Sequence, residues 1–192
     1  MMPILKFFYY SRFSDKRNTV AKVENYKDAC YTGQTKQTVG VLVFSVKNVL
    51  NAHCKNVNSR KSKDLISATP CLNEGLDDTK KCLDVAVRYL QAVEKFNDQS
   101  KSQQKLGQLC CAYSDFIKCA QTNLSKHKNC NEKSINTMVG FLKQILDPMI
   151  DLICGKFSGD TDACDNFQYT PASPTLKYHS FAAPAIHIIS SL

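Results

Sequence analysis

Apolar side chains recur at every third or fourth position along four segments of this chain, a spacing that places them on one face of an α-helix. The first segment contains Val39, Leu42, Val43, Val46, Val49 and Leu50. The second contains Leu83, Ala86, Val87, Leu90 and Val93. The third contains Leu106, Leu109, Cys110, Tyr113, Phe116, Ile117 and Ala120. The fourth contains Ile135, Met138, Val139, Leu142, Ile145, Leu146, Met149, Ile150 and Ile153. The pattern predicts an all-α fold, a disulfide-linked bundle of four to five helices with irregular N- and C-terminal extensions.

Polar stretches predict where the first three helices are separated. Residues 56–63 are polar and basic, which favours a loop after Cys54. Thr69 and Pro70 offer a start for the second helix, because proline fits the first helical turn. Residues 97–105 are polar throughout and indicate a connection to the third helix.

The fourth helix has recognisable signals at both ends. Asn131 or Ser134 can accept a hydrogen bond from its first backbone amides. Pro148 is expected to kink it, because proline lacks the amide hydrogen that the helix needs. Gly155 suits the position after the last helical residue, where a positive φ is common.

Charge and proline content divide the chain into three parts. Residues 1–63 hold twelve Lys and Arg against three Asp and Glu, whereas residues 64–192 hold thirteen against fourteen. We expect a poorly ordered basic segment at 1–36, a cysteine-rich helical domain at 37–166 and a mobile tail with three prolines at 167–192. The N-terminal lysines are scattered and no nucleic-acid motif accompanies them, so nucleic acid is not an expected partner.

Ten cysteines, an even number, predict a disulfide framework and an oxidising, extracellular compartment. The expected half-cystines are Cys30, Cys54, Cys71, Cys82, Cys110, Cys111, Cys119, Cys130, Cys154 and Cys164. A zinc site is disfavoured because the spacings are too open for a compact tetrahedral cage. The pairing stays open. Nine cysteines lie between Cys54 and Cys164, so either Cys30 closes a fifth bridge, or one thiol stays free or joins another chain.

Two features of the cysteine spacing carry structural information. Cys110 and Cys111 are neighbours, so on a helix they point about 100° apart and tie that helix to two different elements. Ten residues separate Cys71 from Cys82, and ten separate Cys119 from Cys130. The repeated spacing indicates either two related helical hairpins or a coincidence.

The sequence offers little support for catalysis, cofactors or metals. None of the four histidines stands in a nucleophile or metal motif. The run from Cys110 to Cys119 is similar to the active helix of secreted phospholipases, but Ser114 stands where their catalytic histidine would lie and no Gly-rich calcium loop precedes it. His53 and Cys54 are neighbours, but a cysteine in a disulfide cannot act as a nucleophile. We therefore do not expect these two residues to form a catalytic Cys/His pair. We expect a protein that is not an enzyme and has no cofactor.

The sequence shows no membrane-spanning segment, and its evidence on secretion is mixed. The apolar stretch 39–46 is too short to span a bilayer, so no transmembrane segment is expected. The start of the chain offers only a short apolar burst at residues 3–10, interrupted by Lys6, and no signal peptide is evident in it. The disulfide framework nevertheless predicts a secreted protein, in which the sequon at Asn123 is an expected N-glycosylation site.

The cysteine frame resembles that of a known family. The spacing CC-x7-C-x10-C is followed by an amphipathic helix that ends in MIDLICGKFSGD and by a further cysteine. It resembles the arthropod haemolymph glycoprotein family and its secreted relatives in arachnids, over residues 50–166. The resemblance implies a secreted, mostly helical, disulfide-linked protein without a known reaction.

These observations favour a non-enzymatic structural or interaction protein of arthropod body fluid or of a secretion such as venom or silk, with an unknown extracellular protein as partner. The alternative is an extracellular carrier of a small apolar molecule or lipid. Its cavity would be lined by Met138, Phe141, Ile145 and Met149, although core packing is the more ordinary role for these residues.

Overall fold

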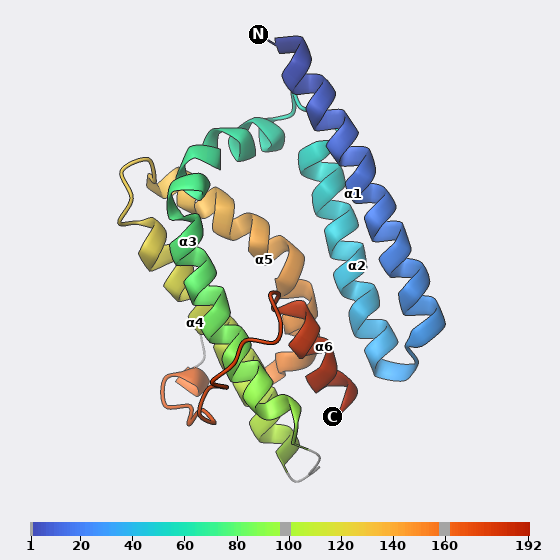
Figure 1. Cartoon of the computed structure of the whole chain (residues 1–192), viewed down its shortest axis with the longest axis vertical. Helices are drawn as coiled ribbons and strands as arrows, with labels where there is room; N and C mark the ends of the chain where they lie inside the picture. The colour runs from blue at the N-terminus through green and yellow to red at the C-terminus, as the bar shows by residue number, and fades with distance from the viewer. Residues whose placement is uncertain (1, 97–100, 158–161) are drawn as a thin grey trace. The chain divides into compact units, whose positions relative to one another are not determined.

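The computed structural model describes residues 2–96, 101–157 and 162–192, and within these ranges the chain is all-α (Figure 1). The six α-helices are α1 (Met2–Cys30), α2 (Gly33–Cys54), α3 (Arg60–Glu94), α4 (Ser102–Leu124), α5 (Glu132–Cys154) and α6 (Ala182–Ser190). Two short 3₁₀ turns, η2 (Gly155–Phe157) and η3 (Asp162–Cys164), follow α5. The predicted fold class is confirmed, and no strand occurs in the described ranges.

The chain divides into two compact units. Unit 1 comprises Met1–Pro70 and Asn131–Met149, and unit 2 comprises Cys71–Cys130 and Ile150–Leu192. Helices α3 and α5 each contribute residues to both units.

Helices α1 and α2 form an antiparallel hairpin in unit 1 (Figure 1). Gly33 starts α2 with φ of 54°, a left-handed conformation that glycine adopts without steric cost. Val39, Val43 and Val49 are buried on α2, as their helical spacing predicts.

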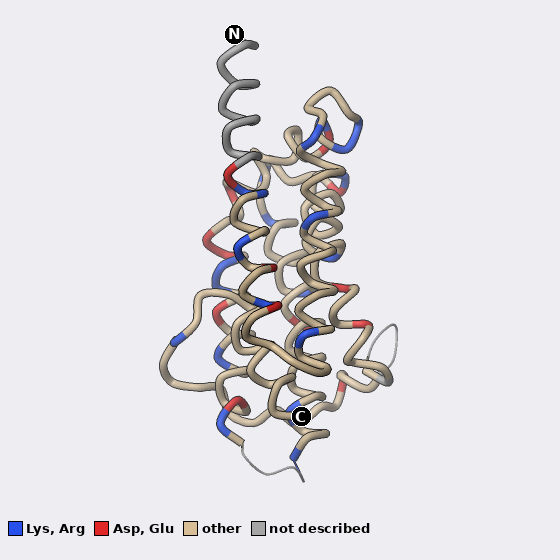
Figure 2. The backbone as a smooth tube through the Cα atoms, turned by 90° about the vertical axis from the view of Figure 1, so that its right-hand side faces the viewer, with Lys and Arg blue, Asp and Glu red and all other residues tan. Residues whose placement is uncertain are grey.

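The expected irregular segment at residues 1–36 is corrected, because α1 covers most of it. Its polar composition shows no clear apolar stripe, and contacts with α2 help to stabilise this helix. Lys47 of α2 pairs with Glu24 of α1, and Lys36 lies 3.3 Å from the Asp28 carboxylate. Figure 2 shows basic and acidic residues interspersed along the helices, and these two ion pairs neutralise part of the positive charge within the hairpin.

Helix α3 begins earlier than the sequence predicts, and Pro70 lies inside it. The Ser59 hydroxyl accepts the backbone amide of Ser62 at 3.2 Å, which caps the first turn. The Ser62 hydroxyl in turn donates to the Asn56 carbonyl at 2.7 Å, which fixes the turn before α3. A polar stretch read as a loop therefore contains a capped helix start. Proline inside a helix removes one backbone hydrogen bond, and α3 continues through it.

The predicted ends of α5 are confirmed. The Asn131 side chain accepts the amide of Ser134 at 2.8 Å, which caps the start of the helix. Gly155 follows the last helical residue with φ of 42°. Pro148 lies inside α5, which runs on to Cys154.

The expected mobile tail at 167–192 is also corrected, because two buried glutamines of unit 2 bind its backbone. Gln108 accepts the amide of Thr170 at 2.7 Å and is itself fully buried. Gln91 accepts the amide of Lys177 at 2.9 Å and donates to the Thr175 carbonyl at 3.0 Å. These bonds satisfy backbone groups that an irregular segment would otherwise leave without partners.

Helix α6 completes the docking of the tail on α4. Ala185, Ile188 and Ile189 are buried, and the Phe181 ring meets Tyr113 edge to face at 5.8 Å between centroids. The fully buried Lys105 of α4 donates to the Ser191 hydroxyl at 2.9 Å. Apolar burial and specific polar bonds together hold this segment as part of the core.

Candidate functional site

Four disulfides link elements of unit 2, and they join Cys71 to Cys130, Cys82 to Cys119, Cys110 to Cys154 and Cys111 to Cys164. Both residues of every bridge belong to unit 2. Eight of the ten expected half-cystines are therefore present, and the chain is a disulfide-rich helical protein.

The neighbouring pair Cys110-Cys111 ties α4 to two different elements, as predicted. Cys110 bonds to Cys154 at the end of α5, and Cys111 bonds to Cys164 in η3. Both cysteines are buried, so the two bridges lie inside the unit.

The equal spacings from Cys71 to Cys82 and from Cys119 to Cys130 face each other along one antiparallel pair of segments. Cys71 meets Cys130 and Cys82 meets Cys119, so the two bridges are nested. On α3, eleven positions are about three full helical turns, so Cys71 and Cys82 lie on nearly the same face; on the other side α4 ends at Leu124, and the segment from there to Cys130 is not helical. The two bridges are thus two rungs of one ladder between α3 and the segment that begins in α4, and the equal spacings do not mark two related hairpins.

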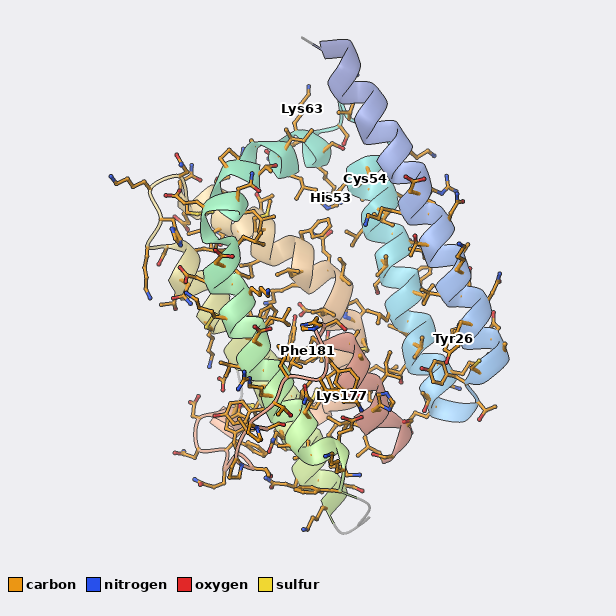
Figure 3. All side chains as sticks on the ribbon, in the orientation of Figure 1. Tyr26, His53, Cys54, Lys63, Lys177 and Phe181 are labelled. Carbon is orange, nitrogen blue, oxygen red and sulfur yellow. A yellow bond between two sulfur atoms is a disulfide. The ribbon has the colours of Figure 1, made fainter. Side chains whose placement is uncertain are left out.

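Cys30 and Cys54 form no disulfide within this chain, which corrects the expectation that all ten cysteines pair inside it. Cys30 ends α1 beside the loop to α2, one turn after Tyr26, whereas Cys54 ends α2 at the far end of the hairpin (Figure 3). The 22 residues of α2 span roughly 33 Å at about 1.5 Å per residue. A disulfide needs Cα atoms about 4.4–6.8 Å apart, so the hairpin keeps these two thiols from pairing with each other.

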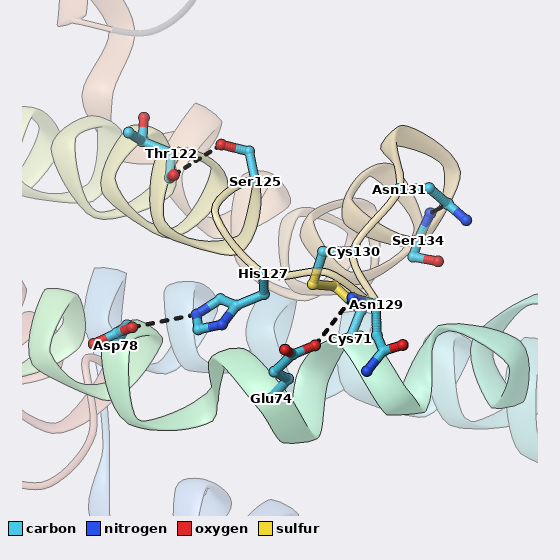
Figure 4. Close-up of a disulfide and its surroundings, with 10 residues drawn as sticks. All are labelled: Cys71, Glu74, Asp78, Thr122, Ser125, His127, Asn129, Cys130, Asn131 and Ser134. Atoms are coloured by element: carbon cyan, nitrogen blue, oxygen red, sulfur yellow. Dashed lines mark hydrogen bonds and ion pairs between the residues drawn. A yellow bond between two sulfur atoms is a disulfide. The ribbon is translucent and has the colours of Figure 1, made fainter.

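A polar cluster surrounds the Cys71–Cys130 bridge (Figure 4). His127 Nε2 lies 3.2 Å from the Asp78 carboxylate, and the Glu74 carboxylate accepts the amide of Asn129 at 3.0 Å. A hydrogen bond from Lys81, 2.8 Å away, is the main cause that lowers the pKa of Asp78, and His127 adds to it. These bonds hold the segment after α4 against α3.

A cleft of about 230 Å³ lies between α3 and α4 next to the inner bridge of the ladder. Its lining comprises Lys81, Cys82, Val85, Ala86, Tyr89, Ala112, Asp115, Phe116, Cys119 and Asn123. Ala86, Ala112 and Phe116 are buried, while Val85 is 53% exposed at the mouth. The cleft is thus apolar inside, with polar groups at its edges.

The antiparallel course of the two helices gives the cleft two chemically different ends. Lys81 and Asn123 lie at one end, where the ammonium of Lys81 is paired with Asp78. Tyr89 and Asp115 lie toward the other end, joined through Tyr169. The Tyr169 hydroxyl donates to the Asp115 carboxylate at 2.7 Å, and its ring lies 4.6 Å from that of Tyr89.

Burial is the main cause that raises the pKa of Tyr169, and the bond to Asp115 raises it further. Tyr169 therefore stays a neutral donor at physiological pH. Among the described residues no basic side chain forms an ion pair with Asp115, so no cation neutralises this carboxylate at the edge of the cleft.

The Asn123 side chain points toward the disulfide at the cleft. Its amide nitrogen lies 3.1 Å from the sulfur of Cys82 and 3.6 Å from that of Cys119. A glycan on this nitrogen would require the side chain to turn outward. The sequon alone gave no sign of this, because it does not reveal that Asn123 lies in the last turn of α4.

The four predicted lining residues of the carrier alternative lie on α5, within unit 1. Met138 and Met149 are buried, and the Phe141 ring meets His53 edge to face at 5.4 Å. Ile145 is half-buried. Such contacts are typical of a packed core, and the lining role stays a prediction.

The described residues offer neither a metal cluster nor a membrane-spanning helix. No cluster of three or more histidine, cysteine, aspartate or glutamate residues arranged to hold a metal ion is found among them. Within the same residues, no helix combines the length and the apolar character needed to cross a membrane. In comparisons with protein-family models, curated proteins and solved structures, none matches this chain.

Proposed function

We propose that this protein is a secreted, non-enzymatic helical scaffold of an extracellular fluid or secretion, and that its disulfide-linked unit binds an extracellular protein. The observation that carries the proposal is the placement of all four bridges within unit 2. Disulfides of this density persist in oxidising compartments and are rare in the cytosol of most organisms.

The cysteine frame supports an arthropod source for this scaffold, through its resemblance to the haemolymph glycoprotein family. Body fluid, venom and silk are the settings that the resemblance suggests. The frame is mainly structural, because its adjacent cysteines anchor α4 to two other elements.

The arrangement of the polar groups supports a role without catalysis. His127 and Asp78 lie beside a cysteine bridge, where the cysteines are oxidised and cannot act as nucleophiles. Their bonds join α3 to the segment after α4, which is a positioning role.

A second candidate is an extracellular carrier of a small apolar molecule, and the cleft between α3 and α4 favours it. An apolar cavity of about 150 Å³ is large enough to bind benzene, and this cleft measures about 230 Å³. The volume suits a single-ring compound and is too small for a long-chain lipid.

The test of the scaffold proposal is to follow the natural protein in the producing tissue. Antibody detection is expected in the extracellular fluid, and non-reducing peptide mapping is expected to recover the four bridges. Crosslinking in that fluid should trap a partner complex that is lost after reduction and alkylation. An intracellular protein with reduced cysteines would contradict the proposal, as would a partner complex that is unaffected by reduction.

A further inference from the structure

The cleft between α3 and α4 has an apolar floor and one uncompensated charge. Ala86, Ala112 and Phe116 are at least 95% buried and form its inner surface together with the Cys82–Cys119 bridge. A planar ring fits such a surface, because flat apolar groups pack well against small side chains and an aromatic edge.

The two ionisable groups at the edges differ in what already neutralises them. Lys81 lies 2.8 Å from the Asp78 carboxylate, so its charge is already compensated. Asp115 accepts one hydrogen bond from the neutral Tyr169 hydroxyl, and none of the ion pairs among the described residues involves it. The charge without a partner at the cleft is therefore the negative charge of Asp115, and this charge favours a cationic ligand.

An aromatic ring lies at the same end as that carboxylate. Tyr89 lines the cleft, its ring is tilted by 35° against that of Tyr169 at 4.6 Å between centroids, and the Tyr169 hydroxyl donates to Asp115. An ammonium at this end would meet both a carboxylate and an aromatic ring, and each attracts a cation.

We infer that the cleft between α3 and α4 binds a small aromatic amine, with its ring over Ala86 and Phe116 and its ammonium at Asp115 and Tyr89. The inference rests on the carrier alternative and adds the chemical class of its ligand. The volume accommodates one ring and an arm of two or three atoms, since about 150 Å³ suffices for benzene alone.

The probe is 2-phenylethylamine, titrated into the oxidised full chain and followed by amide chemical shifts of α3 and α4. Two matched compounds isolate the charge: 2-phenylethanol is neutral, and 3-phenylpropanoate is an anion with the same ring and arm. We expect shifts around the cleft, about fivefold tighter binding of the amine than of the alcohol, and weaker binding still of the acid, because exposed charge pairs contribute modestly.

Three variants separate direct from indirect effects. Asp115→Asn should lower the affinity for the amine to that for the alcohol, and it should fold because the side chain is exposed. Asp77→Asn removes the same charge from α3 outside the cleft and should leave binding unchanged. Tyr169→Phe removes the hydroxyl that occupies Asp115 and should keep or strengthen binding of the amine.

Each contrary outcome would overturn a different part of the proposed aromatic-amine site. Equal binding of amine and alcohol at the cleft would overturn the charge preference and leave an apolar carrier. Tightest binding of the acid would assign the dominant charge to Lys81 instead. Loss of amine binding in Tyr169→Phe would show that Asp115 acts only by holding residue 169. Absence of binding for all three compounds would overturn the site, while the scaffold proposal would still depend on its own test.

Discussion

Removing the inner bridge of the disulfide ladder is the most direct test of how unit 2 is stabilised. The perturbation is the double variant Cys82→Ala/Cys119→Ala. The bridge spans 37 residues, and the chain-entropy model assigns about 4 kcal/mol to closing a loop of that length.

The outer bridge, which encloses the inner one, reduces this free energy of loop closure. Cys71–Cys130 already encloses the segment, and the cysteines of the two bridges are eleven positions apart on each side. With the outer bridge intact, the inner bridge closes a loop of roughly 22 residues, which corresponds to about 3.4 kcal/mol. In its absence the full 37-residue loop applies. The two bridges should therefore be worth less together than the sum of their separate values.

Urea unfolding without reductant, followed by circular dichroism at 222 nm, measures the loss. We expect the double variant to lose about 3 to 4 kcal/mol of unfolding free energy. Cys30→Ala is the matched control, because its thiol is exposed and closes no bridge, and its effect should stay within about 0.5 kcal/mol. A loss below about 1 kcal/mol in the double variant would refute the loop-entropy reasoning for this pair.

Three further outcomes follow from local geometry. Gly107→Ala should lose about 1–2 kcal/mol in thermal or urea unfolding, because its new Cβ would lie 2.4 Å from the Phe167 ring, whereas Gly140→Ala, with nothing within 4 Å, should gain up to about 1 kcal/mol; equal effects would contradict the packing. The pKa of Asp78 is lowered in the folded state, so its contribution is present above its unfolded value of about 3.9 and is lost as pH falls further. The difference in melting temperature between wild type and Asp78→Asn should therefore shrink below about pH 4, and a constant difference would argue against the ion pairs. Glycosidase treatment of protein from a eukaryotic secretory host should leave the mass unchanged, because the Asn123 amide faces two sulfur atoms; a mass loss at this site would show that the side chain turns outward.

Local signals predicted much of the fold correctly. The apolar stripes of α2, α4 and α5 and the caps at Asn131 and Gly155 are properties of a few consecutive residues, and the structure places them as expected. Helix α1 escaped prediction because contacts such as Lys47 with Glu24 join residues distant in sequence.

The candidate site was less accessible to sequence reasoning. Ala86 and Phe116 belong to apolar stripes that read as core, and nothing local marks them as walls of a cleft. Asp115 and Tyr169 are 54 positions apart, so their hydrogen bond has no signature in the sequence. The tail was missed for a related reason, since Gln91 reads as a polar surface residue until the backbone it binds is known.

The sequence by itself determined that this protein is helical, that it contains disulfides and that Cys110 and Cys111 leave their helix in different directions. These follow from residue type and from the fixed rotation of about 100° per residue along a helix. Only the tertiary structure decided which cysteines pair, why Cys30 and Cys54 do not pair with each other, and where a cleft remains. Those outcomes depend on which helix faces meet, and that is set by the packing of segments far apart in the chain.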